Sequence, residues 1–361
     1  MTAPIRVGVV GTSWWAELMH LPSLTSHPRA MVAAVCGRDA GRAAALAARY
    51  SVPASFTNYE TMIGEAALDA VIVATPDDLH APVATHALDH GLHVLCEKPL
   101  ARTAADARSM YDHAARAGVV HMVFFTYRWV PAYRFLRDLV ADGRIGRPLG
   151  FALSFVNGYG LRPGYAWRYD ARRSAGVVAD LGAHMIDLVR WILDDEPRRV
   201  SASLTTFAAH AAPPHEQAGL MPSANDSAVL ALELTGGAHG MLHCSSVARL
   251  GDQGSSKEIT LRGDRGTIEA GITLSGAEVR LFGDDGRPAQ RLEIPDHYGA
   301  NASGDTLALF REQPIGARLF IDAIAAGTHP TPSFHDGWRV QEVIDAALRS
   351  AASGRWEAVP A

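Results

Sequence analysis

Short apolar runs alternate with amphipathic segments over the first third of the chain. The apolar runs predict strands over residues 5–10, 31–36, 70–73, 93–96 and 119–124. Apolar residues spaced three or four apart predict helices between them, over residues 14–24, 40–50, 59–66 and 103–117. Buried strands that alternate regularly with helices indicate an α/β fold of the Rossmann type, a doubly wound parallel sheet.

The pattern changes after residue 125. A helix is predicted over residues 131–141, and strands dominate from there to about residue 294. These strands are expected over 149–156, 199–207, 227–233, 238–247, 256–262, 266–270, 278–282 and 291–294. Two helices, over 304–326 and 335–352, close the chain. We therefore predict two domains, residues 1–125 and 126–361, the second an α+β domain with a large, mostly antiparallel sheet.

Composition limits the classes of protein to consider. The chain has 361 residues, 48% hydrophobic and 20% charged, with a formal net charge of −5 and no basic block, which argues against a nucleic-acid-binding surface. Its three cysteines lie far apart and are interpreted as reduced core residues. The sequence contains no signal-peptide pattern and no apolar run of membrane-spanning length, so we expect a cytoplasmic protein that does not bind membranes.

A glycine turn follows the first predicted strand. Residues 11–16 read Gly-Thr-Ser-Trp-Trp-Ala, and the dinucleotide-binding fingerprint has glycine, glycine and glycine or alanine at the first, third and sixth of these positions. Gly11 and Ala16 match, whereas Ser13 departs from the pattern. An ordinary tight turn between a strand and a helix would use the same glycine, so this motif alone leaves both interpretations open.

The end of the second strand bears on the choice of cofactor. NAD-binding units usually place an Asp or Glu there for the ribose hydroxyl, but this sequence has Gly37-Arg38. A guanidinium group suits the additional phosphate of NADP, so NADP is favoured modestly over NAD. The alternative is a surface arginine that opens the next helix.

Two later strands also end in polar residues. Thr75 and Pro76 follow one strand, with His80 near the start of the next helix, and Glu97-Lys98 follow the strand 93–96. Ligands bind at the carboxyl ends of strands in open parallel sheets, which makes these positions candidates for a site. A strand followed by a solvated turn explains Glu97 and Lys98 equally well on this segment alone.

The second half contains one polar pair at helical spacing. Asp180 and His184 are four residues apart and share a helix face beside an apolar stripe, so they belong either to a hydrogen-bonded network or to a site. Without further clustered ligands, we predict no metal site. The preceding segment, 157–174, is rich in Gly, Tyr, Trp and Arg, which suits either a sugar-like ligand or an Ω-type loop packed on its own aromatic residues.

The chain resembles the Gfo/Idh/MocA oxidoreductase family, which is named after glucose–fructose oxidoreductase and inositol dehydrogenase. The resemblance is carried by three segments that occur in this order, GTSWWA (11–16), ATPDDLH (74–80) and CEKP (96–99). The resemblance extends over essentially the whole chain. It implies a dinucleotide-binding domain in residues 1–125 and a substrate-binding and oligomerisation domain in residues 126–361. It also implies an NAD(P)-dependent enzyme that transfers a hydride between the nicotinamide and a secondary alcohol of a sugar, inositol or related polyol, as a homodimer or homotetramer.

The resemblance further implies roles for individual residues. The implied cofactor-binding residues are Gly11, Ser13, Trp14, Trp15, Ala16, Arg38, Thr75, Pro76, His80, Glu97 and Lys98. The implied substrate-binding residues are Lys98, Arg128, Trp167, Arg168, Asp180 and His184. Lys98, Asp180 and His184 would be the catalytic trio, with His184 as general base and Lys98 stabilising the alkoxide or, alternatively, acting as the base.

Two other functions fit the same resemblance. Some relatives cleave glycosides without net redox change, by transient oxidation and elimination at the nicotinamide. Others are sensors that bind the dinucleotide without turnover. Intact Lys98, Asp180 and His184 argue against the sensor, because a protein that only binds the dinucleotide does not need these three residues. We rank the dehydrogenase first, the glycoside-cleaving enzyme second and the sensor third.

Overall fold

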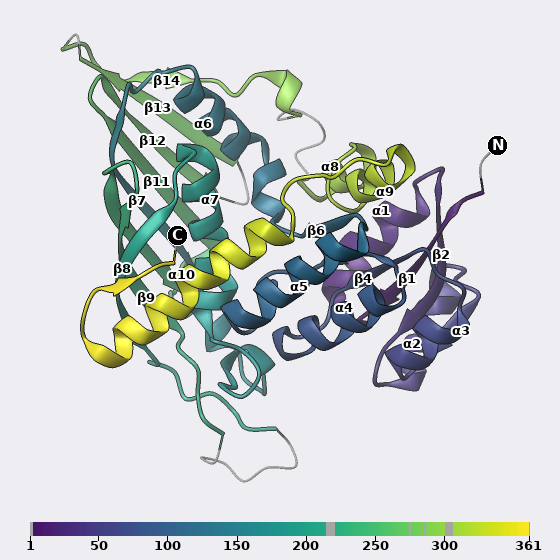
Figure 1. The fold of residues 1–361 in the computed structure, drawn as a ribbon. Coiled ribbons are helices and arrows are strands. Elements are labelled where there is room, and N and C mark those ends of the chain that lie inside the picture. Colours follow the sequence, from purple (N-terminus) through teal and green to yellow (C-terminus); the bar gives the residue numbers. More distant parts are fainter. Residues whose placement is uncertain (1–2, 214–220, 274–275, 285, 300–305, 361) are drawn as a thin grey trace. The chain divides into compact units, whose positions relative to one another are not determined.

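The computed structural model contains two compact units, each built around its own sheet (Figure 1). It describes residues 3–213, 221–273, 276–284, 286–299 and 306–360. Unit 1 comprises Met1–Thr126 and Asp305–Arg339, and unit 2 comprises Tyr127–Gly304 and Val340–Ala361.

Unit 1 contains a six-stranded sheet in which every strand pair is parallel. Its strands are β1 (Ile5–Val10), β2 (Ala30–Cys36), β3 (Ala54–Phe56), β4 (Ala70–Val73), β5 (His93–Cys96) and β6 (His121–Val123). Their order, β3-β2-β1-β4-β5-β6, is the strand order of dinucleotide-binding doubly wound folds. The predicted parallel sheet is confirmed, and only the short β3 was not predicted.

Helical segments connect these strands. They are η1 (Ala16–His20), α1 (Leu21–Thr25), α2 (Ala40–Arg49), α3 (Tyr59–Glu65), η2 (Asp77–Leu79), α4 (His80–Asp89) and α5 (Ala104–Ala117). Two further helices of unit 1, α8 (Thr306–Glu312) and α9 (Ala317–Ala326), come from late in the chain. The central strand β4 is buried along its whole length, as expected for a strand with helices on both faces of its sheet. The single helix predicted over 304–326 is two helices, α8 and α9.

The segment Asp305–Arg339 returns to unit 1. The Ser23 hydroxyl donates to the carbonyl oxygen of Phe310 at 2.7 Å, and the Phe124 and Phe310 rings lie 6.0 Å apart. The rings of Phe334 and His121 lie 5.1 Å apart. A single boundary after residue 125 does not include this return, because an amphipathic pattern predicts a helix without indicating which core it joins.

Unit 2 contains a nine-stranded sheet in the order β14-β13-β12-β11-β7-β10-β9-β8-β15. Its strands are β7 (Pro148–Asn157), β8 (Pro197–Thr205), β9 (Ser227–Leu234), β10 (His239–Ser245), β11 (Ser255–Gly263), β12 (Gly266–Thr273), β13 (Gly276–Gly283), β14 (Gln290–Leu292) and β15 (Glu357–Ala358). Its neighbouring strands pair antiparallel except β7 with β10, so the predicted mostly antiparallel sheet is confirmed.

Helical segments also build unit 2. They are η3 (Thr126–Trp129), α6 (Pro131–Ala141), η4 (Tyr159–Leu161), η5 (Trp167–Tyr169), η6 (Val178–Gly182), α7 (Ala183–Leu193), η7 (Gly251–Gln253) and η8 (Asp296–Tyr298). Helix α10 (Phe334–Ser353) begins in unit 1 and ends in unit 2.

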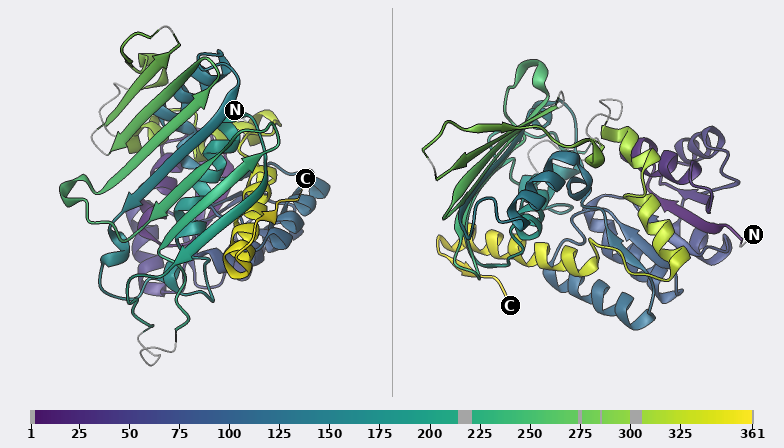
Figure 2. Two further views of the ribbon diagram at one scale, coloured as in Figure 1. Left: turned by 90° about the vertical axis from the view of Figure 1, so that its left-hand side faces the viewer. Right: turned by 90° about the horizontal axis from the view of Figure 1, so that it is seen from above.

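The two faces of the nine-stranded sheet differ. Phe151, Leu153 and Phe155 alternate along β7 and are buried on the inner face, where α6 and α7 lie (Figure 2). The outer face carries Met241, which is 57% exposed, and Val229, which is 43% exposed. Strand alternation therefore gives this sheet a buried inner face and a partly apolar outer face.

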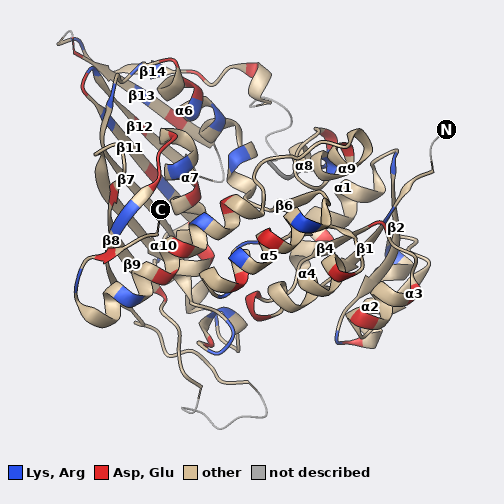
Figure 3. Cartoon of the chain, viewed as in Figure 1, with Lys and Arg blue, Asp and Glu red and all other residues tan. Residues whose placement is uncertain are grey.

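Charged residues of both signs are distributed along the helices and strands, for example on α5 and α10 (Figure 3). None of the helices that the structure describes is long and apolar enough to cross a membrane.

Candidate functional site

The turn after β1 requires glycine. Gly11 has φ +123°, and a Cβ atom at this position would lie 2.2 Å from the carbonyl oxygen of Ala74, which directly follows β4. Any other side chain would separate the ends of β1 and β4. The sequence motif thus corresponds to a real close approach of two backbone segments at the carboxyl edge of the parallel sheet.

Ser13 replaces the second glycine of the fingerprint and stabilises the start of the helix. Its hydroxyl accepts a hydrogen bond from the backbone N–H of Ala16 at 3.3 Å. The first turns of this helix are a π-helix, η1, a geometry that occurs often at functional sites. The leading N–H groups of a helix lack intrahelical partners, so this turn suits the pyrophosphate of a dinucleotide.

Glu97, at the end of β5, is held by two side chains of the first helix, and we call these three residues the Glu97 cluster. Its Oε1 atom accepts from Trp15 Nε1 at 2.6 Å and lies 2.8 Å from His20 Nε2. His20 is fully buried, and its ring lies 4.6 Å from that of Phe124. Trp15 and Glu97 belong to the predicted site, whereas His20, the last residue of η1, was not predicted.

His80 joins the two neighbouring strand ends. Its Nδ1 lies 2.7 Å from the carbonyl oxygen of Pro99 and its Nε2 lies 3.0 Å from that of Thr75. Both ring nitrogens therefore contact backbone, and His80 positions the two loops. Thr75 Oγ1 is buried without a hydrogen-bond partner among the described residues. An orphaned hydroxyl at the carboxyl end of β4 fits a ligand that brings its own polar groups, as a dinucleotide does.

Lys98 is partly buried immediately after β5, and its backbone N–H approaches Glu97 Oε2 at 3.4 Å. The Glu97 cluster therefore fixes the residue that precedes Lys98. Pro76 lies beside Thr75 and is partly buried as well. Trp14 is 59% exposed, and its ring packs edge-on against Trp15.

Arg38 lies exposed after β2 and forms no salt bridge with any residue that the structure describes. The adjacent acid, Asp39, is the N-cap of α2 and accepts from the backbone N–H of Arg42 at 2.9 Å. Asp39 is thus engaged with the helix, and the charged side chain that remains for a ligand at the end of β2 is the guanidinium group of Arg38.

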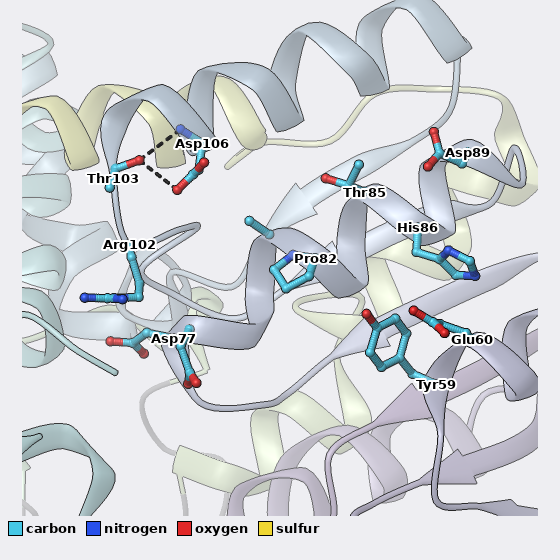
Figure 4. A pocket seen from close by; sticks show the side chains of 12 residues that line it. Tyr59, Glu60, Asp77, Pro82, Thr85, His86, Asp89, Arg102, Thr103 and Asp106 are labelled. Carbon is cyan, nitrogen blue, oxygen red and sulfur yellow. Dashed lines mark hydrogen bonds between the residues drawn. The ribbon is translucent and has the colours of Figure 1, made fainter. Parts of the chain in front are cut away.

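A separate pocket of about 620 Å³ lies beside α3, α4 and the start of α5 (Figure 4). Its lining includes the carboxylates of Glu60, Asp77, Asp78, Asp89 and Asp106, and contains none of the predicted cofactor-binding residues. This acidic lining disfavours a pyrophosphate, so the pocket is not the expected dinucleotide site.

In unit 2, a continuous helix formed by η6 and α7 carries Asp180 and His184, as the spacing predicted. Its first turn is again a π-helix. Asn225, from a distant segment, fixes this turn, because its Oδ1 accepts from the backbone N–H of Val178 at 3.1 Å and its Nδ2 donates to the carbonyl oxygen of Ala175 at 2.6 Å.

The Asp180 carboxylate is held by residues of the aromatic loop. Its Oδ2 accepts from the Tyr159 hydroxyl and lies 3.3 Å from Arg168 Nε. Burial, reinforced by the negative charge of Asp180, raises the pKa of Tyr159 well above its usual value, so this phenol stays a donor. The Arg168 guanidinium in turn packs over the Trp167 ring at 4.6 Å.

His184 is 8% exposed and stacks on Tyr127, with ring centroids 4.3 Å apart and planes inclined by 26°. Burial, and secondarily the charge of Asp180, raises the pKa of Tyr127. Sequence analysis missed Tyr127, although it is adjacent to Arg128. The structure thus brings Asp180, His184, Arg168 and a tyrosine pair together within unit 2.

Arg128 has a different environment from that expected of a substrate-binding residue. Its Nε and Nη2 donate to the two carboxylate oxygens of Asp187 at 2.9 and 2.5 Å, and both side chains are buried. Because Asp187 lies on α7 three residues after His184, this ion pair fixes the helix that carries His184. Among the described residues, no group of three or more His, Cys, Asp or Glu could hold a metal ion.

Comparison with known proteins identifies similar sequences over both units. A model of an oxidoreductase family with an NAD-binding Rossmann fold, GFO/IDH/MocA, matches residues 5–125. The model of the GFO/IDH/MocA C-terminal domain matches residues 133–269.

Individual relatives match most of the chain. Levoglucosan dehydrogenase of Pseudarthrobacter phenanthrenivorans is 28% identical over 88% of this chain and 87% of its own. Inositol 2-dehydrogenase 1 of Saccharopolyspora erythraea is 29% identical over 97% of this chain and 95% of its own. A solved structure of levoglucosan dehydrogenase in complex with NADH is 26% identical, covers 99% of both chains and superimposes with a TM-score of 0.86.

Proposed function

Because the chain belongs to the Gfo/Idh/MocA family of NAD-binding oxidoreductases, we propose that it oxidises a secondary alcohol of a sugar, inositol or related polyol. The observation that carries this proposal is the imidazole of His184, fixed by stacking on Tyr127, one helical turn from the Asp180 carboxylate. Oxidation of an alcohol needs a group that removes the hydroxyl proton, and a positioned histidine is the commonest such group.

The dinucleotide would be held by the carboxyl edge of the parallel sheet. Gly11 permits the turn, the N–H groups that follow Ser13 suit the pyrophosphate, and the unpartnered Thr75 hydroxyl suits the ribose near the nicotinamide. When bound, the nicotinamide supplies the hydride acceptor or donor. Glu97, held by Trp15 and His20, fixes the turn and the strand end relative to each other.

In this proposal His184 takes the hydroxyl proton, and Asp180 hydrogen-bonds a neighbouring substrate hydroxyl or the imidazole. Lys98 donates to the reacting oxygen and stabilises the developing alkoxide charge. Lys98 is the alternative base. Trp167 and Arg168 would contribute the remaining contacts to the sugar, since an aromatic face and a guanidinium group both suit a polyol ring.

We propose NADP as the preferred cofactor. Arg38 is exposed at the end of β2, and the adjacent Asp39 is engaged as a helix cap. A guanidinium group in this position favours the 2′-phosphate, whereas a ribose hydroxyl would require an acid there. We also propose that the outer sheet face, with Met241 and Val229, pairs with a second copy to form a homodimer or homotetramer.

Turnover with a panel of sugars and inositols, run in parallel with NAD⁺ and NADP⁺, tests the activity. The absorbance of the reduced nicotinamide reports the reaction. Turnover with one polyol class is expected, faster with NADP⁺. No turnover with any substrate of the panel, despite dinucleotide binding, would contradict the proposal. Release of an aglycone without formation of reduced cofactor would indicate the redox-neutral glycosidase.

The pH dependence of variants tests the residue roles. His184→Ala should lower kcat by about 10²–10⁴-fold and remove the acidic limb of the kcat/KM profile. Lys98→Met should lower kcat and leave that limb in place. His90→Ala, which removes an exposed histidine at the end of α4, is the matched control. Substantial turnover by both active-site variants would overturn the assignment.

A further inference from the structure

Lysine is almost absent from this chain. Of its 33 basic residues, 31 are arginines, and the two lysines are Lys98 and Lys257. An ammonium group is compact and titratable, whereas a guanidinium group is planar and permanently charged, so the two are not interchangeable. Lys98 has a place in the proposed function, and Lys257 has none so far.

Lys257 lies on the inner face of the nine-stranded sheet. It pairs with Phe155 across the β11–β7 ladder, and two residues further along Ile259 pairs with Leu153. Phe155, Ile259 and Leu153 are all buried, so the alternation of β11 directs Lys257 into the same layer. The sequence signal that could have identified Lys257 is a lysine at a strand position that faces the core.

The ammonium group of Lys257 lies among aromatic rings next to the His184 stack. Its Nζ is 4.7 Å from the Phe155 ring centroid and 5.7 Å from that of Tyr127. Tyr127 is the residue on which His184 stacks, so one aromatic ring separates Lys257 from the proposed general base. Nζ donates to Ser255 Oγ at 3.1 Å, which uses one of its three protons.

No carboxylate of the described residues pairs with this ammonium group. Burial is the one cause that shifts its pKa, which falls to about 8, so no neighbouring acid restores the charged form. The aromatic faces offset part of the desolvation. An unpaired, partly buried ammonium group is unfavourable in the free protein, and a ligand that brings the missing negative charge would remove this cost.

We propose that Lys257 determines substrate specificity by binding a carboxylate substituent, so that the substrate is a sugar acid rather than a neutral sugar. The inference rests on the proposed function, because it places the acid group beside the Tyr127–His184 stack. The compact ammonium group fits between Phe155 and Tyr127, and its two remaining protons are available to carboxylate oxygens.

Matched substrate pairs test specificity. Glucuronate is compared with glucose and galacturonate with galactose, for the wild type, Lys257→Met and the control Arg262→Met, which removes an exposed cation from the same strand. The wild type should favour the acids by about tenfold or more in kcat/KM. Lys257→Met should lose roughly 30-fold on the acids through KM and leave the neutral sugars unchanged. Equal losses on acid and neutral sugars, or a wild type that prefers neutral sugars, would overturn the inference.

Amine labelling gives a readout that does not depend on turnover. Acetic anhydride modifies Lys98, Lys257 and the terminal amine, which peptide mass spectrometry separates. With reduced cofactor present, glucuronate should slow modification of Lys257, and glucose at the same concentration should not. Equal rates with both sugars would contradict carboxylate binding. Protection without oxidation of any substrate would support Lys257 and refute the dehydrogenase, whereas oxidation of neutral sugars without protection would do the reverse.

Discussion

Two carboxylates, one in each unit, lie beside π-helical turns and are held in different ways. Glu97 is held by an indole N–H and an imidazole, and its side chain is 10% exposed. Asp180 is held by a tyrosine hydroxyl and a guanidinium group, and its side chain is 14% exposed beside an arginine that is 32% exposed. Glu97 is thus fixed by an indole and an imidazole, whereas Asp180 is fixed by a phenol and by a partly exposed guanidinium group.

The difference suggests a supporting role for Glu97 and a substrate-binding role for Asp180. The Glu97 cluster connects a strand end to the helix of the glycine turn, so its rigidity serves the cofactor-binding backbone. Arg168 is the more exposed member of the Asp180 pair, and in the proposed function both residues exchange part of this pairing for substrate contacts.

The largest effect should come from the ion pair that fixes the Asp180 helix. Asp187→Ala leaves the Arg128 guanidinium buried without its bidentate partner, and should reduce the free energy of unfolding by about 3–5 kcal/mol. Denaturant unfolding measures this loss. Glu269→Ala, which breaks the exposed pair with Arg280, should cost about 0–1 kcal/mol, and equal losses in the two variants would refute the structural role of Arg128.

Removing one donor from each carboxylate compares the two sites directly. Trp15→Phe deletes a hydrogen bond to buried Glu97 and should cost about 1.5–3 kcal/mol of stability. Tyr159→Phe leaves Asp180 with Arg168 and should cost about 0.5–1.5 kcal/mol, while changing KM for the substrate. The same unfolding assay measures both. A larger stability loss in Tyr159→Phe would reverse the distinction between the two carboxylates.

Lys257→Met should stabilise the protein by about 1–3 kcal/mol at neutral pH, because it removes a partly buried ammonium group. The folded-state pKa of about 8 lies below the ordinary value of 10.5, so the cost is fully present below pH 8. Between pH 8 and pH 10.5 the Lys257 amine is protonated in the unfolded chain but not in the folded chain, so the stability of the wild type rises with pH. The advantage of Lys257→Met should therefore shrink from pH 8 to 10. An advantage that stays constant would contradict the shifted pKa.

The smallest effect concerns the choice of cofactor. Arg38→Ser should lower kcat/KM for NADP⁺ by about tenfold, with little change for NAD⁺, because it removes one phosphate contact. Arg42→Ser is the matched control, since Arg42 is also exposed at the start of α2. Faster turnover of the wild type with NAD⁺ would refute the interpretation of Arg38.

The parallel sheet of unit 1 could be predicted from the sequence except for β3, and its candidate site residues follow strands that are neighbours in the sheet, β1, β4 and β5. The return of residues 305–339 to this unit could not be predicted. The turn at Gly11 and the residues after β4 and β5 each follow an apolar run that the pattern identifies. His20 was missed because a π-helix shifts the helical spacing on which the prediction relied.

The site residues of unit 2 come from elements that sequence patterns do not connect. Asp180 and His184 were predicted because they share a helix, but Tyr127, Tyr159 and Lys257 reach the same region from three other segments. For Arg128 the resemblance implied a substrate contact, and the structure adds a buried partner, Asp187, that no sequence pattern indicated. In each of these cases the contact joins residues that are distant in the sequence, which a local pattern cannot indicate.

The return of residues 305–339 to unit 1 has a consequence for the order in which the protein is made. Phe320 and Phe334 are fully buried and belong to the half of the chain that is translated last. A ribosome that has completed the whole six-stranded sheet has therefore not yet delivered these parts of its core. Synthesis of unit 1 starts first, but its last residues are made only after most of unit 2, so nascent chains shorter than about residue 339 lack part of the core of unit 1.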